Sequence, residues 1–110
     1  MVGNFFEGGS HMLNTALIEG VLIEPVTYVE EEMKAFLKIK NVVGDSASIF
    51  PLVVEGNTAE ICRNVLKVGD MVRAVGKLVL IDTTIGRKKV MWVRIYVEHI
   101  EFRKETTCTA

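Results

Sequence analysis

One stretch of the sequence, residues 48–80, restricts the fold more than any other part of the chain. It opens with the apolar run SIFPLVVE, continues with NTAEICRNVL, and ends after Val-Gly-Asp in a second apolar run, MVRAVGKLVL. Short apolar runs bounded by Gly and Asp are typical of strands, whereas apolar residues spaced three and four apart are typical of a helix. The stretch therefore predicts a strand, a short helix and a second strand.

Three further segments have the pattern of β-strands. Residues 13–24 are mostly apolar, with Gly20 where a barrel strand would bend and Pro25 where it would end. Residues 33–43 and 90–102 alternate with period two, which is typical of half-buried strands. The chain is predicted to be all-β, with five strands and one short α-helix between strands three and four.

Local signals predict the ends of the helix and a break in the third strand. Asn57 followed by Glu60 resembles a capping box, and Gly69 is expected to end the helix. The apolar helix residues are expected to close one end of the sheet: Ile61, Cys62, Val65 and Leu66. Pro51 has no N–H to donate, so the third strand should have a bulge or a free edge there.

The order of these segments resembles the middle of bacterial single-stranded-DNA-binding proteins. In that family an apolar strand ends in Gly, a short helix begins near Ala-Glu, and a strand reading Val-x-x-x-Gly-x-Leu follows Lys-Gly. The matching positions here, with Val where Lys is usual, are Val53, Val54, Gly56, Ala59, Glu60, Val68, Gly69, Val72, Gly76, Lys77 and Leu78. The resemblance covers residues 13–102 and implies a five-stranded oligonucleotide/oligosaccharide-binding barrel, the OB-fold.

The 110 residues are enough for one domain. Residues 1–12 end in Gly-Gly-Ser-His-Met, which resembles the remnant of an expression vector, so we expect the domain over 13–102 and a short polar tail over 103–110. Without Glu7 in that first segment, 13 basic residues face 13 acidic ones. Binding to phosphates usually requires a basic excess, so here it must depend on the local arrangement of charge.

Composition gives little support to catalysis, cofactors or a membrane role. No apolar run is long enough to span a bilayer, and we expect a cytoplasmic protein without membrane contact. Cys62 and Cys108 have no disulfide or metal-site spacing, and no catalytic triad order is visible. We therefore expect no enzyme activity, no cofactor and no metal.

The outward face of the second predicted strand is the first candidate site. It carries Lys34, Phe36, Lys38 and Lys40, which we call the lysine stripe. Cations that follow phosphates and rings that stack on bases are the means by which an OB-fold holds a single strand. The alternative is a solvated strand face on which Phe36 packs at a subunit contact.

The loop and strand that follow residue 80 supply further candidates. Arg87, Lys88 and Lys89 form a basic hairpin tip, although such clusters are also common aids to solubility. Trp92, Arg94 and Tyr96 occupy every second position and so share one face of the last strand, where Trp92 could stack on bases or anchor a subunit interface.

The period-two alternation predicts that several apolar side chains point away from the barrel interior. They are Ile49, Pro51, Val53, Val75 and Val79. A monomer would leave such a set in water, so we expect a homodimer or homotetramer that buries it.

Two functions remain open at this point. The first is non-enzymatic binding of single-stranded DNA, or of RNA, in replication, repair or recombination, with replication proteins as further partners. The second is an OB-fold module for protein–protein assembly that binds no nucleic acid. The lysine stripe and the family pattern favour the first, which is the leading hypothesis. At the positions where the resembled family stacks its aromatic rings, this chain has Ile49, Glu55 and about Thr83, and this together with the neutral charge favours the second. The family's long Gly- and Pro-rich tail is also missing, so a tail-less dimeric relative, the primosomal replication protein, is the closer comparison.

Overall fold

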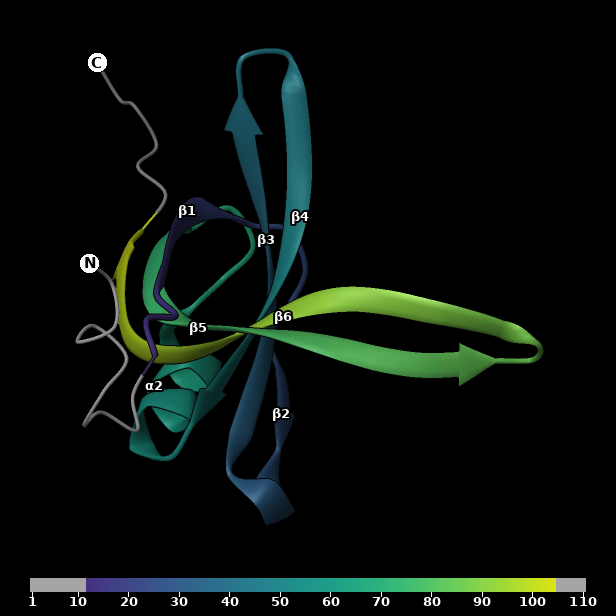
Figure 1. The fold of residues 1–110 in the computed structure, drawn as a ribbon. Coiled ribbons are helices and arrows are strands. Elements are labelled where there is room, and N and C mark those ends of the chain that lie inside the picture. Colours follow the sequence, from purple (N-terminus) through teal and green to yellow (C-terminus); the bar gives the residue numbers. More distant parts are fainter. Residues whose placement is uncertain (1–11, 105–110) are drawn as a thin grey trace.

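The computed structural model describes residues 12–104, which form a mostly β structure with one α-helix (Figure 1). Its elements are β1 (Ala16–Leu22), β2 (Thr27–Val29), the 3-10 turn η1 (Glu30–Glu32), β3 (Lys34–Val43), β4 (Ser46–Glu55), α2 (Asn57–Val65), β5 (Met71–Ile85) and β6 (Lys88–Arg103). Most of the predicted vector remnant and of the predicted tail lies outside the described residues.

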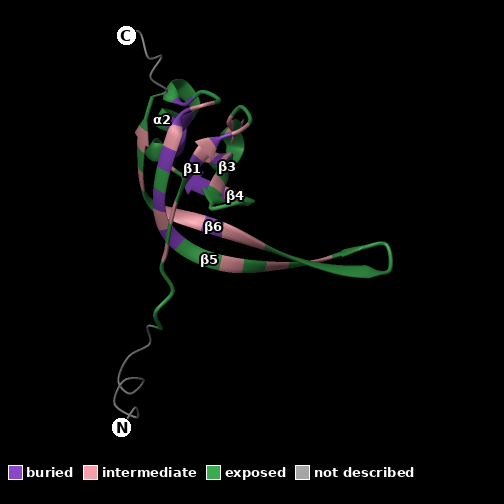
Figure 2. Ribbon diagram, turned by 90° about the horizontal axis from the view of Figure 1, so that it is seen from above, coloured by how far each residue is buried: buried purple, intermediate pink, exposed green. Residues whose placement is uncertain are grey.

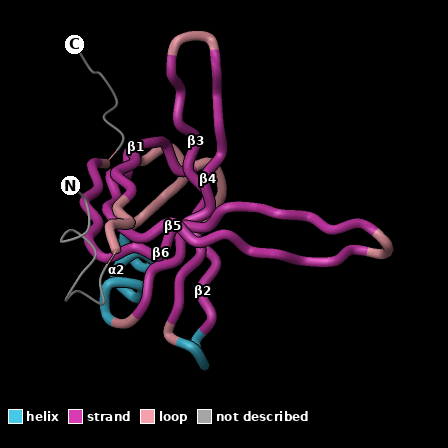
Figure 3. Tube along the Cα trace, in the orientation of Figure 1, coloured by secondary structure: helices cyan, strands magenta, loops and turns pink. Residues whose placement is uncertain are grey.

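The six strands belong to one sheet in the order β1-β5-β6-β4-β3-β2 (Figure 3). β1 also pairs with β3, with Val21 opposite Lys40 and Leu22 opposite Ile39, so the sheet closes on itself. The expectation of five strands was wrong by one. The additional strand is β2, which lies in the connection after Pro25 and pairs with the start of β3.

The core fills the closed part of the sheet, while the parts of the sheet that extend beyond it are largely exposed (Figure 2). Its buried residues come from five strands and the helix: Leu22, Ala35, Leu37, Ile39, Leu52, Val54, Ala59, Cys62, Leu66, Val72, Ala74 and Ile95. Helix α2 contacts β2, β3 and β4. Cys62 in the helix and Leu66 directly after it are buried as predicted, but Ile61 and Val65 are 49% and 38% exposed, and Ala59 is buried in addition.

Both ends of the helix differ from the prediction. Asn57 is the first helical residue rather than the cap, and the cap position is occupied by Gly56 with a φ of 73° and no side-chain hydrogen bond. Because an L-residue rarely adopts that φ, the backbone geometry requires Gly here. The helix ends four residues before Gly69, which has a φ of 101° and lies in the turn before β5.

Two hairpins, β3–β4 and β5–β6, extend from the closed sheet as long arms that point in different directions (Figure 1). β4 and β6 pair in parallel only at Leu52–Ile95 and Val53–Tyr96, and the arms separate beyond that point. Pro51 comes directly before the short parallel pairing and has no partner in β6, which agrees with its predicted free edge.

The tip of the β5–β6 arm is tighter than the sequence indicated. The sequence predicted one strand that ends near residue 80 and a next one that begins at residue 90, but the strands continue through most of the range between and leave only Gly86 and Arg87 in the turn. Gly86 has a φ of 65°, which matches the primed turns that two-residue hairpin loops require. The basic tip therefore belongs partly to β6.

A change in register marks the place where the β5–β6 arm leaves the core. Val75 lies opposite His99 but Gly76 lies opposite Val97, so Glu98 is the extra residue of a β-bulge. The bulge reverses the alternation of β6, and Ile100 therefore packs against the core although it is an odd number of residues from Val97, which does the same.

Candidate nucleic-acid interface

The lysine stripe lies on the outer face of β3. The alternating residues Ala35, Leu37 and Ile39 are fully buried, which directs the lysines and Phe36 outward. Phe36 is half-buried, whereas Lys38 and Lys40 are exposed. The face is thus the ring-and-cation surface that the sequence indicated.

Arg94 connects this face to the aromatic residue of β6. Its guanidinium carbon lies 4.6 Å from the centre of the Trp92 ring and 5.6 Å from the centre of the Phe36 ring. Both distances are within the range of a cation–π interaction. Among residues 12–104, Arg94 forms no ion pair, so its charge is stabilised by the two rings but is not neutralised by a carboxylate.

A cleft of about 310 Å³ lies where the two arms separate. It is lined by Glu24, Thr27, Phe36, Leu37, Lys38, Pro51, Leu52, Trp92 and Arg94. Trp92 is 37% exposed, so part of its surface is open to a ligand. Strands β3 and β6 thus bring two aromatic rings and two cations to one concave place.

Carboxylates from the segment between β1 and β3 partly neutralise the lysine stripe. Lys38 Nζ lies 3.4 Å from Glu24 Oε1, and Lys34 Nζ lies 3.7 Å from Glu32 Oε1. Lys40 makes no ion pair within the described part of the chain. The local positive charge is therefore smaller than the sequence pattern alone indicated.

The basic tip is not part of the cleft. Arg87, Lys88 and Lys89 lie at the end of the β5–β6 arm, and Lys88 is four residues, roughly 13 Å of extended strand, from Trp92. Lys88 shares the Trp92 face of β6 because it is an even number of residues away, whereas Lys89 is on the opposite face. A ligand would have to follow the arm to contact both the cleft and the tip.

Two charged residues of the cleft, Arg94 and Glu24, were not among the predicted binding residues. Arg94 was considered only as a neighbour of Trp92, although its place two residues along the same strand face was a usable signal. Glu24 gave no local signal, because it approaches β3 through tertiary pairing. Ile23 N–H donates to the Lys38 carbonyl at 3.1 Å and Thr27 pairs with Phe36, so this segment follows β3.

The predicted interface residues differ in exposure. Ile49 is 59% exposed and Pro51, Val75 and Val79 are half-buried. Val53 is only 2% exposed within the single chain, so the reasoning that a monomer leaves it in water does not hold for this residue. In register it lies between Phe36 of β3 and Tyr96 of β6, whose large side chains occupy the same face.

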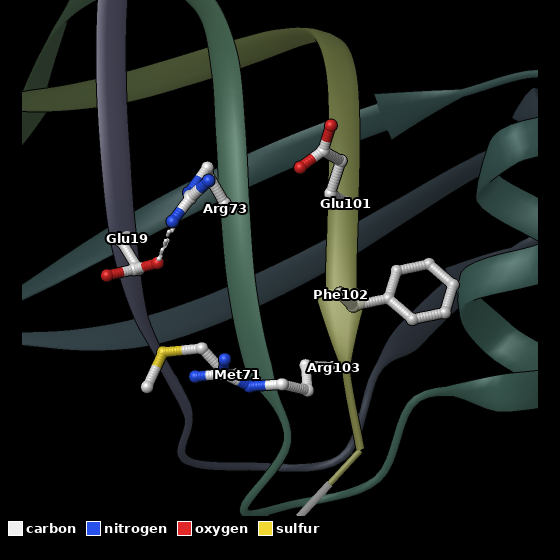
Figure 4. Close-up of a pocket in the computed structure, with 6 residues that line it drawn as sticks. All are labelled: Glu19, Met71, Arg73, Glu101, Phe102 and Arg103. Atoms are coloured by element: carbon white, nitrogen blue, oxygen red, sulfur yellow. Dashed lines mark hydrogen bonds and ion pairs between the residues drawn. The ribbon is translucent and has the colours of Figure 1, made fainter.

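A second pocket, of about 140 Å³, lies on the outer face of β1, β5 and β6 (Figure 4). One of its two arginines is engaged, because the Arg73 guanidinium donates to Glu19 Oε2 at 2.9 and 3.2 Å. The Phe102 ring points away from the other labelled side chains. Glu19 and Glu101 are as numerous in this pocket as Arg73 and Arg103, so it has no excess of positive charge, and its ring is not directed at a ligand.

The described residues contain little that could support other chemistry. Residues 12–104 include no group of three or more His, Cys, Asp or Glu residues placed to hold a metal ion. Burial raises the pKa of the Cys62 thiol to about 11, which keeps it protonated and unreactive at neutral pH. No helix in this part of the chain is long and apolar enough to cross a membrane.

Comparison with known proteins identifies the fold. No protein-family model matches the sequence, and no curated protein shows significant sequence similarity. The structure is nevertheless similar to solved structures of single-stranded-DNA-binding proteins, and it therefore shares their fold. One is the mitochondrial single-stranded-DNA-binding protein of S. cerevisiae, with a TM-score of 0.71, 11% identity, and coverage of 86% of this chain and 100% of that one.

A second similar structure is the small single-stranded-DNA-binding protein of Streptomyces coelicolor. It has a TM-score of 0.67 and 14% identity, with 84% of this chain and 96% of that chain covered. The similarity agrees with the family resemblance of residues 48–80, and identities this low define the fold but not the site.

Proposed function

We propose that this chain is a non-enzymatic, single-stranded-DNA-binding protein of replication, repair or recombination, and that the strand crosses the cleft where the two arms separate. The observation that carries the proposal is the convergence of Phe36, Trp92 and Arg94 in one cleft. Stacking rings beside cations are what a single strand requires. The fold shared with single-stranded-DNA-binding proteins supports the same conclusion.

The cleft residues would divide the binding between bases and phosphates. Phe36 and Trp92 would each stack on a base, an interaction of about 1–3 kcal/mol by alanine substitution. Lys38, Lys40 and Arg94 would contact phosphates on either side. Lys34 and the basic tip would extend the contact along the two arms, which makes the affinity depend on the length of the oligonucleotide.

DNA and RNA use the same stacking surfaces, so RNA is the natural competitor ligand. An oligo-U competitor added to a complex with oligo-dT measures the preference directly. The proposal for DNA requires that oligo-U compete more weakly than oligo-dT of the same length.

Assembly into a homodimer or homotetramer belongs to the same proposal. Ile49 is exposed on the outer face of the β3–β4 arm, and Val75 and Val79 are half-buried on β5. A symmetric contact between two chains would remove these side chains from water and would double the number of clefts available to one strand. Replication proteins are proposed as further partners.

One observation favours the protein-assembly module as a second candidate function. Both arms carry exposed apolar side chains that the core does not use: Val42, Val43, Ile49, Leu78, Leu80, Ile85 and Met91. Exposed apolar groups of this kind are typical of protein interfaces. A protein that associates with itself or with other proteins but does not bind oligonucleotides would have this second function.

Fluorescence titration distinguishes the two functions, because Trp92 is the only tryptophan. Addition of oligo-dT should quench its emission, and the affinity should fall as salt rises. Replacing Lys38 and Lys40 by Glu should reduce the slope of log affinity against log salt by roughly 0.7 per lost phosphate contact. The control is Lys77→Glu, outside the cleft. No quenching, or equal slopes in all three proteins, would contradict the proposal.

A further inference from the structure

The segment between β1 and β3 presents carboxylates to the lysine stripe in a fixed arrangement. After β1 the chain turns back along β3, held by the hydrogen bond from Ile23 N–H to the Lys38 carbonyl and by the pairing of Thr27 with Phe36. Glu24 lies between these two attachment points. The backbone on both sides therefore keeps residue 24 beside β3, within reach of the Lys38 side chain.

The Glu24–Lys38 contact is located in the cleft itself. Both side chains line it, and their charged atoms lie 3.4 Å apart. The two side chains are 50% and 54% exposed, so the ion pair is in contact with water and weak. A weak, exposed pair can be displaced by another anion.

A second ion pair of the same kind, between Glu32 and Lys34, lies at the start of β3. Met33 has a φ of 52° and ends the turn η1, which brings Glu32 to 3.7 Å from Lys34. Two of the three lysines of the stripe are thus paired with carboxylates from one connecting segment. A carboxylate and a phosphate group compete for the same ammonium group.

We propose that Glu24 is an internal competitor for the phosphate backbone: it occupies Lys38 in the free protein and lowers the affinity for a single strand that must displace it. This inference rests on the proposed function of the cleft. A phosphate group that binds Lys38 must first displace the carboxylate, so the net binding free energy of that contact is smaller than it would be with a free lysine. Glu32 acts in the same way on Lys34, farther from the rings.

A substitution of Glu24 tests the proposal against a closely matched control. Glu24→Gln removes the charge and keeps the size of the side chain. The control, Glu98→Gln, removes a carboxylate that is 3.7 Å from Lys77, in a pair of similar exposure that does not line the cleft. Both variants change the net charge equally, so a general electrostatic effect on affinity appears in both.

Affinity for a labelled oligo-dT is measured by fluorescence anisotropy at low salt. We expect Glu24→Gln to bind roughly two- to five-fold more tightly than the wild type, which is the range for loss of an exposed ion pair. Glu98→Gln should gain less than half of that factor. The gain of Glu24→Gln should disappear in a Lys38→Gln background, because the competitor then has no lysine to occupy.

The outcomes separate this inference from the proposed function. If the wild type binds oligo-dT but Glu24→Gln gains no more than Glu98→Gln, the internal competition is refuted and the binding function stands. A gain that persists in full without Lys38 also refutes it, since Glu24 would then act only through long-range repulsion. A wild type that does not bind overturns both.

Discussion

Gly76 lies where the β5–β6 arm leaves the core, and its replacement by Ala should be strongly destabilising. A Cβ at this position would lie 2.2 Å from the Tyr96 carbonyl oxygen and 2.9 Å from the Val97 Cα atom. Both atoms belong to the backbone of β6, so no side-chain rotation can relieve the contact. The two strands would have to separate at the bulge.

The cost follows from two opposing effects. Overpacking of this kind costs typically about 1–3 kcal/mol, and a lost backbone hydrogen bond adds about 0.5–1.5 kcal/mol. The smaller freedom of Ala in the unfolded chain offsets about 0.4–1 kcal/mol. We therefore expect the free energy of unfolding to fall by about 1–3.5 kcal/mol, which lowers the Tm by roughly 5–25 °C for a domain of this size.

Urea unfolding followed by circular dichroism measures this change. The control is Gly44→Ala, at the tip of the other arm, where φ is 59° and a Cβ meets nothing within 4 Å. It should lose only about 1 kcal/mol, from the left-handed backbone alone. If Gly76→Ala loses no more than Gly44→Ala, the close approach of β5 and β6 is refuted.

Two further predictions concern buried groups. Because burial raises the pKa of Cys62 to about 11 from 9.0 in the unfolded chain, its contribution to stability is complete below pH 9 and is lost as pH rises from 9 toward 11. In a Cys108→Ser background, the urea midpoint should therefore fall more between pH 8 and 10 than it does in Cys62→Ala, and equal falls would contradict this. Lys104→Met removes an amine that lies 2.7 Å from the carboxylate of Asp70, which is 2% exposed, and should cost about 1–2 kcal/mol in the same assay. Lys77→Met, which breaks an exposed pair, should cost under about 0.5 kcal/mol, and similar losses in the two variants would show that the contact with Asp70 is not stabilising.

The parts of the fold that depend on local pattern could be predicted from the sequence. The period-two alternation of residues 33–43 identified the buried face of β3, and the helix began within one residue of the expected position. Strand β2 was missed because three residues are too few to show a period-two alternation. The strand exists because it pairs with β3. The bulge at Glu98 was missed for the same reason, since it is defined by its register with β5.

The candidate site shows the same division between local and long-range information. The period-two alternation was sufficient to predict that Phe36 and Trp92 point outward on their own strands. Their approach through Arg94 depends on the short parallel pairing of β4 with β6, which joins residues about 40 positions apart in the chain. Period two also misjudged Val53, because an outward direction does not mean exposure when large neighbours cover the position.

The central claim is that a single strand binds in the cleft between the arms. Ultraviolet cross-linking of the protein to oligo-dT, followed by mass spectrometry of the modified peptides, locates the contact without a mutation. The predicted result is cross-linking at Phe36 or Trp92, the two rings that line the cleft. Cross-links confined to the opposite face, at Met71 or Phe102, would contradict the claim.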